Sequence, residues 1–288
     1  MRRSFIKFAA ALVAGFVALG GAVAAERPLT LAFIPQENPD KLIGDISEIS
    51  RYLAGELGRP VRGFVTLDHT AAIEALSAEK ADISFMGALP YVMARAQNGA
   101  RAILSEVYRG KPYYASAIFV RRDSGIRTIE ELRGKTIAFA DPVSESGYLY
   151  PREIFVRAKL FSRKDDLHAF FRRVYFAGGY QQAIQAVTNG LVDSAGVSIY
   201  APLLLPSNQQ IDALPIAQSP PIPSHAVIAR KGLGPEITEA FVKAMLKLNQ
   251  PSHRRLLKYV YNPDGYVRAT PDAYEGVAKL ARQYGLIR

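Results

Sequence analysis

The segment Ser144–Gly147 holds the residues whose types and spacing best suit binding chemistry. It stands between a strand-like run that ends at Ala140 and a helix-like run that follows it. At such a junction the first backbone N–H groups have no partner inside the helix and lie at its positive end. The hydroxyls of Ser144 and Ser146 would add donors, and Gly147 would let a ligand approach the backbone closely. The segment predicts a cradle for a small oxyanion, although a serine here also serves as an ordinary helix cap.

Glu145 is the unusual member of this cradle. A carboxylate about 4 Å from a bound anion would oppose it by about 4 kcal/mol at an effective dielectric of 20. That energy corresponds to roughly a thousandfold in affinity. Two interpretations stay open: the side chain points away from the pocket, or it binds a cationic part of the ligand.

The motif around the cradle has a counterpart in a known family. The block Asp141-Pro142-x-Ser144-x-Ser146-Gly147, followed by Pro151, resembles the D-P-x-S-x-S-G…P segment of the periplasmic phosphonate-, phosphite- and phosphate-binding proteins of ABC importers. Residues 81–92 resemble the family's A-D-I-x-F-x-G-x-x-x-Y-V segment, residues 121–135 its R-x-D-S-G-I…L-x-G-K segment, residues 183–193 its A-I-x-A-V-x-x-G-x-V-D run, and Tyr274 its closing region. The likeness extends over nearly all of the chain after residue 25.

The resemblance implies two α/β lobes that close on a ligand, as in type II-like periplasmic binding proteins with two chain crossovers. It implies that the serine-glycine segment holds the anion from the second lobe and that Tyr91 reaches it from the first. Of the neighbouring Tyr113 and Tyr114, one would line the cleft while the other packs; we take Tyr114 as the ligand residue and leave the choice open. Gln36 follows the first strand, and ligands bind at the carboxyl ends of parallel strands, so it is a further candidate.

Two positions depart from the family pattern. Tyr180 stands where family members commonly carry a histidine, and its phenol donates a hydrogen bond but does not become cationic near neutral pH. Ser198 stands where an acidic or amide residue often follows the V-D strand, so an aminoalkyl ligand would lack its usual carboxylate. We include both as ligand-binding candidates and expect a pocket that differs from those of the relatives.

Strand-like and helix-like runs alternate along the chain, which is typical of an α/β fold with largely parallel sheets. The predicted domains are residues 26–115 with 218–288 as a discontinuous first lobe, and residues 116–217 as a second lobe that includes the hinge strands. The predicted strands cover residues 29–34, 61–66, 82–86, 115–120, 136–140, 174–176, 194–197 and 226–229. Two crossings between lobes make a hinge, and the cleft between hinged lobes is a natural ligand site.

The N-terminal residues 1–25 have the composition of a secretory signal peptide: three cations, then an apolar run that ends in a small-x-small pattern. The apolar run is shorter than the roughly 20 residues that span a bilayer, with an uncleaved anchor as the alternative. The chain has no cysteine, which excludes disulfides, thiolate metal sites and a lipid-bearing cysteine. We therefore expect a protein released into the periplasm, the location that suits a freely diffusing receptor.

The remaining motifs favour a receptor over an enzyme. The four histidines are far apart and lack metal-ligand spacing, and no nucleophile elbow, P-loop or dinucleotide fingerprint follows the signal peptide. We expect no catalytic residue, metal or cofactor. The net charge of +10 comes from scattered lysines and arginines, without a basic helix or zinc-finger spacing, so nucleic acid is not an expected partner.

The expected function is capture of a phosphonate, phosphite or phosphate by a monomer that delivers it to an ABC transporter permease. Two alternatives stay open. One is a receptor of the same fold for another oxyanion or an organic solute, reporting to a sensor kinase. The other is an enzyme on this fold related to pyrimidine synthases.

Overall fold

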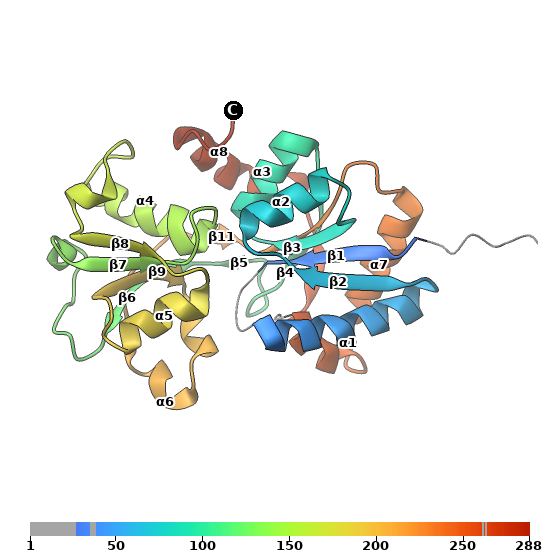
Figure 1. Cartoon of the computed structure of the whole chain (residues 1–288), viewed down its shortest axis with the longest axis horizontal. Helices are drawn as coiled ribbons and strands as arrows, with labels where there is room; N and C mark the ends of the chain where they lie inside the picture. The colour runs from blue at the N-terminus through green and yellow to red at the C-terminus, as the bar shows by residue number, and fades with distance from the viewer. Residues whose placement is uncertain (1–26, 35–38, 261, 263) are drawn as a thin grey trace, which may run out of the picture.

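The computed structural model describes residues 27–34, 39–260, 262 and 264–288, and within them the chain forms two α/β halves joined by a narrow connection (Figure 1). One half is built on a six-stranded sheet and the other on a five-stranded sheet. We call them the first lobe and the second lobe. The α/β fold with two lobes expected from the sequence is confirmed. None of the helices in the described part is long and apolar enough to cross a membrane.

The first lobe takes its strands from two distant stretches of the chain. Its sheet has the order β13-β4-β12-β3-β1-β2, in which β1 pairs in parallel with β2 and β3, while β12 pairs antiparallel with β3 and β4. The strands are β1 (Leu29–Phe33), β2 (Val61–Val65), β3 (Ile83–Met86), β4 (Arg101–Glu106), β12 (Ala226–Ala229) and β13 (Tyr266–Arg268). The helices are α1 (Pro39–Leu57), α2 (His69–Ser77), α3 (Ala88–Asn98), α7 (Pro235–Lys247) and α8 (Glu275–Gln283). Gly58 follows α1 with a φ of 61°, a left-handed conformation that glycine adopts without strain and that ends the helix.

The two faces of this sheet carry separate cores. One core packs α2, α3 and α8 against the sheet and includes Ile73, Leu89 and Val277. The other packs α1 and α7 against the opposite face and includes Leu53 and Phe241. Helices on both faces explain why the central strand β3 is buried along its whole length.

The second lobe is formed by one continuous stretch. Its sheet has the order β10-β6-β9-β7-β8. The strands are β6 (Ser116–Arg121), β7 (Thr136–Phe139), β8 (Arg173–Phe176), β9 (Ser194–Ser198) and β10 (Ala213–Gln218), and the helices are α4 (Tyr150–Arg157), α5 (Tyr180–Thr188) and α6 (Ser207–Gln210). Short 3₁₀ helices cover Glu130–Leu132, Leu167–Ala169, Ala201–Leu204, Arg254–Val260 and Pro271–Tyr274 in the two lobes. Separate cores on its two faces contain Ile184 of α5 and Phe155 of α4.

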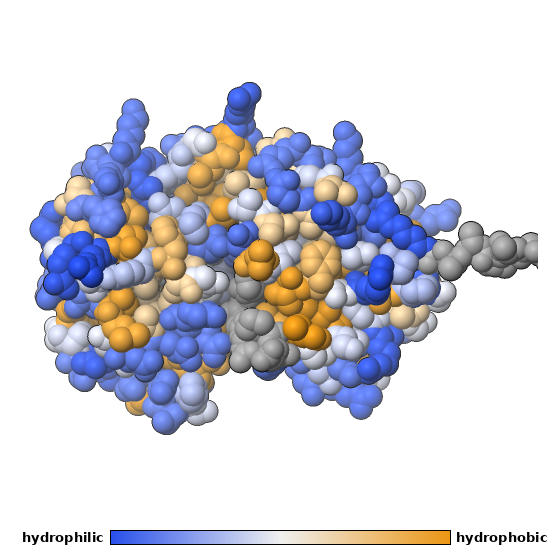
Figure 2. All heavy atoms as spheres, viewed as in Figure 1, coloured by the Kyte–Doolittle hydropathy of each residue, from blue (hydrophilic) through white to orange (hydrophobic). Residues whose placement is uncertain are grey.

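The connection between the lobes is a two-stranded ribbon. Strand β5 (Tyr113–Tyr114) leaves the first lobe and pairs antiparallel with β11 (Ile222–Pro223), on which the chain returns. Both strands lie just outside residues 116–217, the span predicted for the second lobe; the exact domain boundaries stay a prediction. On the face shown in Figure 2, hydrophilic residues spread over both lobes, consistent with the scattered charge of the sequence.

Candidate ligand-binding site

The predicted cradle lies at the carboxyl end of β7 and is buried between the lobes. Ser144 has an extended backbone and its Oγ accepts a hydrogen bond from the Gly147 N–H at 3.0 Å. A single π-helical turn (Glu145–Leu149) follows and leads into α4. The serine therefore does cap the turn. A Cβ on Gly147 would lie 2.6 Å from the Ala140 Cβ, so this glycine is required by packing of the chain on itself.

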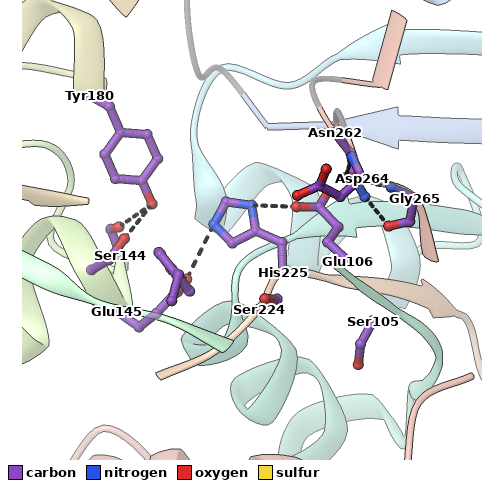
Figure 3. Close-up of polar contacts among 12 residues, drawn as sticks. Ser105, Glu106, Ser144, Glu145, Tyr180, Ser224, His225, Asn262, Asp264 and Gly265 are labelled. Carbon is purple, nitrogen blue, oxygen red and sulfur yellow. Dashed lines mark hydrogen bonds and ion pairs between the residues drawn. The ribbon is translucent and has the colours of Figure 1, made fainter. Parts of the chain in front are cut away.

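Tyr180, the first residue of α5, covers both serines of the cradle. Its hydroxyl lies 3.0 Å from Ser144 Oγ (Figure 3). It also lies 3.0 Å from Ser146 Oγ. Burial raises the pKa of the phenol, so the hydroxyl keeps its proton. The hydroxyls that were predicted to face an oxyanion thus bind a phenol of the same chain in this structure.

Glu145 is fully buried and crosses to the first lobe. Its Oε1 accepts a hydrogen bond of 2.6 Å from the Tyr114 hydroxyl, and its Oε2 accepts one of 3.2 Å from the Leu89 backbone N–H. Oε1 also lies 3.4 Å from Nε2 of His225. The carboxylate therefore lies among donors of the first lobe and the hinge, and the two interpretations of Glu145 stay open.

His225 joins two carboxyl groups from different lobes, one fully buried and one partly exposed. Its Nε2 faces Glu145 and its Nδ1 lies 3.9 Å from Oε2 of Glu106 (Figure 3). Burial disfavours the imidazolium, yet the two glutamates together raise the pKa of His225. Burial also opposes the charge of Glu145, but hydrogen bonds from His225 and Tyr114 outweigh it and lower its pKa to about 2. Burial raises the pKa of Glu106 to about 7. At neutral pH Glu145 is therefore anionic and Glu106 lies near its midpoint, while both carboxyl groups favour the protonated form of His225.

A cavity of about 240 Å³ lies beside this cluster. Aromatic and aliphatic side chains form most of its wall, and its lining residues are Glu106, Tyr108, Tyr114, Tyr180, Ser198, Tyr200, Ala201, Leu203, Leu204, Ser224 and His225. Tyr108 of the first lobe stacks on Tyr200 of the second, with ring centroids 3.4 Å apart. Among the described residues, Ser224 Oγ is a buried group of this wall without a hydrogen-bond partner. The cavity thus offers apolar surface, and its wall contains one unpaired, buried hydroxyl.

The structure distributes the remaining predicted residues unevenly. Ser198 lines the cavity, where its Oγ accepts a hydrogen bond from the Tyr200 N–H at 3.3 Å. Tyr114 lines it too, whereas Tyr113 is 47% exposed and is not among the lining residues. Tyr91 lies in the first-lobe core, where its ring packs edge-on against Tyr274 at 4.8 Å, and it is not part of the cavity wall. Gln36 lies outside the described residues.

Sequence reasoning missed Glu106, Tyr108, Tyr200 and His225 in the site. Glu106 is the last residue of β4, so the rule that placed Gln36 could have found it, whereas His225 precedes the antiparallel strand β12 and the rule does not select it. Among the described residues, His69 is a second buried histidine near Glu145, and its Nδ1 has no hydrogen-bond partner. No group of histidines and carboxylates in the described part of the chain could hold a metal ion.

Comparison with known proteins places this arrangement among transport proteins. A family model described as "ABC transporter, phosphonate, periplasmic substrate-binding protein" matches residues 31–274. A phosphate-import protein of Mycolicibacterium smegmatis is 29% identical over 172 residues, which cover 58% of this chain and 53% of the relative. The aligned part thus spans about half of that relative.

Two further comparisons cover most of the chain. A probable ABC transporter phosphite binding protein of Prochlorococcus marinus is 21% identical over 275 residues, covering 90% of this chain and 91% of the relative. A crystal structure from Prochlorococcus marinus in complex with methylphosphonate has a TM-score of 0.77 at 20% identity, covering 90% of this chain and 98% of that chain. At this identity the structural likeness shows a shared fold.

Proposed function

From the premise that the chain belongs to the family of periplasmic phosphonate-binding proteins of ABC transporters, we propose that it captures a small phosphorus oxyanion between its lobes. A phosphonate, phosphite or phosphate is then delivered to the permease of an ABC importer. The protein works as an exported monomer, and residues 1–25, which lie outside the described residues, direct its export. Its role is binding alone, without a chemical step.

One observation carries this proposal: the first lobe and hinge bind a carboxylate. The Leu89 N–H stands in the first turn of α3, where backbone donors and the positive end of the helix favour an anion. The Tyr114 hydroxyl and the imidazole of His225 complete the set on the hinge side. These are donors for an oxyanion, and the chain's own Glu145 occupies them. The serines of the second lobe add two further donors.

The arrangement of the lobes supports capture by closure. The chain crosses between them twice, on β5 and β11, which makes a hinge of two short strands. Tyr114 belongs to this ribbon, and His225 lies two residues after the end of its second strand, β11. Opening of the hinge would therefore separate Tyr114 and His225 from the serines of the second lobe. When such a protein closes, the binding residues of the first lobe and those of the second lobe surround one ligand.

The cavity wall favours an organic substituent on the ligand. Its tyrosine and leucine side chains offer apolar surface that an inorganic oxyanion does not use, while Ser224 Oγ is a buried hydroxyl of the wall without a partner among the described residues. We therefore rank an organophosphonate above inorganic phosphate and phosphite. A receptor for an organic solute without phosphorus is the second candidate, favoured by the same wall.

A thermal-shift screen of the mature protein tests the proposal. The panel contains phosphate, phosphite, methylphosphonate, aminoethylphosphonate, sulfate and unrelated organic solutes. A ligand at 100 times its dissociation constant stabilises the fold by about 2.7 kcal/mol, which raises the melting temperature measurably. If an uncharged solute raises it and no phosphorus compound does, the oxyanion assignment is wrong and the second candidate is supported.

Serine variants locate the site. Ser144→Ala and Ser146→Ala each remove a hydroxyl from the cradle and should weaken binding of the best phosphorus ligand by about tenfold, the equivalent of about 1.4 kcal/mol for one lost hydrogen bond. Ser207→Ala, on the exposed start of α6, is the matched control and should bind like wild type. Isothermal titration calorimetry measures all three. Unchanged affinity in both cradle variants would remove the cradle from the site.

A further inference from the structure

The carboxylate of Glu145 lies where a captured anion is expected. It comes from the second lobe, yet its two oxygens bind the Leu89 N–H, the Tyr114 hydroxyl and the imidazole of His225, which belong to the first lobe and the hinge. With 0% of its surface exposed, it is removed from water as a bound ligand would be. A carboxylate and an oxyanion have the same chemistry toward these donors, because both accept hydrogen bonds with a negative charge.

Gly87 makes the space that this carboxylate fills. A Cβ at that position would lie 2.5 Å from Oε1 of Glu145 and closer still to Oε2. The φ of Gly87 is −70°, a value that any residue adopts, so the backbone does not require glycine here. Glycine at position 87 is therefore needed only because its lack of a side chain leaves room for the Glu145 carboxylate. The first lobe is thus open to an anion at this point, and the structure shows which one occupies it.

We propose that Glu145 is the specificity-determining residue of the site: its carboxylate is an internal ligand that joins the lobes without solute and competes with the solute's anionic group for the first-lobe donors. The inference rests on the proposed capture of an oxyanion. Solute binding then includes expulsion of this carboxylate from Leu89, Tyr114 and His225. The affinity for the solute is therefore set by the difference between the binding free energies of the two anions at these donors.

Charge balance gives the competition its strength. Among the described residues of the cavity wall, His225 is the one side chain that can carry a positive charge, and it already faces Glu145 and Glu106. A second anion entering beside Glu145 would find no further cation in this wall and would be repelled by the carboxylate. Exchange of one anion for the other avoids that repulsion. Tyr180 occupies the hydroxyls of the second-lobe serines in the same way. Its hydroxyl is neutral, so a ligand displaces it at a lower free-energy cost than it displaces a charged carboxylate.

Calorimetric titration of Glu145→Ala with methylphosphonate, phosphite and phosphate tests the competition. If the internal carboxylate holds the donors in about 99 of 100 molecules, removing it tightens binding about a hundredfold. Glu145→Gln, which keeps the shape but not the charge, should tighten binding less. It also covers the case in which the alanine variant does not fold, as judged by circular dichroism.

Two further variants separate the mechanism from general loosening of the interface. Glu153→Gln is the matched control, because Glu153 is a buried carboxylate of the second lobe that accepts a hydrogen bond from Tyr284 of the C-terminal segment, away from the anion donors. It should leave oxyanion affinity unchanged. Gly87→Ala expels the carboxylate but fills the same space, so it should open the empty protein without tightening the binding of any oxyanion.

Small-angle X-ray scattering on the ligand-free proteins gives a readout that does not depend on the ligand. Wild type and Glu153→Gln should have the radius of gyration of the closed form, while Glu145→Ala and Gly87→Ala should have a larger one. For Glu145→Ala, tighter oxyanion binding and a larger radius of gyration must both be observed, because both follow from loss of the same internal ligand.

The outcomes distinguish this inference from the proposed function. Equal affinity of wild type and Glu145→Ala overturns the inference and leaves oxyanion capture standing. Weaker binding by Glu145→Ala also overturns it, because Glu145 would then contact the ligand favourably. If no variant binds any of the three probes, oxyanion capture fails, and the scattering result alone decides whether Glu145 holds the empty lobes together: an unchanged radius refutes that as well.

Discussion

Replacement of Glu145 by glutamine should remove a specific part of the protein's acid sensitivity. The pKa of this carboxyl is lowered from 4.5 to about 2, mainly because hydrogen bonds from His225 and Tyr114 outweigh the effect of burial. A group whose pKa is lower in the folded state stabilises the fold above its unfolded value and loses that contribution as pH falls through the folded value. The contribution is therefore complete above about pH 5 and lost near pH 2.

The magnitude follows from the shift. A difference of about 2.5 pKa units at 1.36 kcal/mol each gives about 3 kcal/mol of unfolding free energy. Burial lowers the pKa of the neighbouring His69, whereas the charge of Glu145 raises the pKa of both His69 and His225. Both histidines are present in the two proteins. The difference between wild type and Glu145→Gln as a function of pH therefore reports the loss of this carboxyl together with its effect on the two histidines.

Urea unfolding at pH 5, 4, 3 and 2 measures this difference. The chain contains no tryptophan and 15 tyrosines, so far-ultraviolet circular dichroism and tyrosine fluorescence are the suitable probes. We expect the unfolding free energy of wild type to fall by about 3 kcal/mol more than that of the variant between pH 5 and pH 2. Parallel curves over this range would refute the reasoning, because Glu145 would then have the same pKa in the folded and unfolded chain.

Three other substitutions test separate features. Glu106→Gln should raise the unfolding free energy at pH 8 by up to about 3 kcal/mol and change it little at pH 4. The reason is that a carboxyl whose pKa is raised to about 7 stabilises the fold only while it is protonated. Thermal unfolding at the two pH values checks this, and an equal effect at both would contradict it. Tyr180→Phe leaves both cradle serines without their phenol partner and should cost about 1–2 kcal/mol in urea unfolding, with no loss if water replaces the phenol fully. Gly196→Ala would bring a Cβ to 2.5 Å from the Pro151 Cβ and should cost about 1–3 kcal/mol. Gly55→Ala in α1, where nothing lies within 4 Å, is its control and should stabilise by about 0.5–1 kcal/mol; equal melting temperatures for these two variants would argue against the packing at position 196.

Local patterns predicted the elements because each depends on neighbours in the sequence. The runs at residues 29–34, 61–66 and 115–120 form strands β1, β2 and β6 within one residue of the predicted ends. Strand β10 was missed because Pro215 interrupts its pattern. It lies at the edge of its sheet, where proline is tolerated, and its register shifts between Pro215 and Ala217.

The site was predictable only in part because its members meet across the lobes. The serine-glycine segment was found from a local motif, and Ser144 and Ser146 do lie in the cluster. The direction of Glu145 depends on Leu89, 56 residues away, and on Tyr114, 31 residues away, and no local rule supplies such pairs. Tyr91 shows the reverse: its motif matches the family, yet in this chain its ring packs in the core.

The position of β12 controls the order in which the two lobes can be completed. This strand lies between β3 and β4 and supplies pairing to both, although it follows them in the chain by more than a hundred residues. A growing chain that has not yet reached Ala226 holds β3 and β4 as two unjoined parts with open strand edges. The second lobe, complete by Gln218, needs no later strand. The first lobe is therefore the last to complete its sheet. It stays incompletely folded until most of the chain has been synthesised.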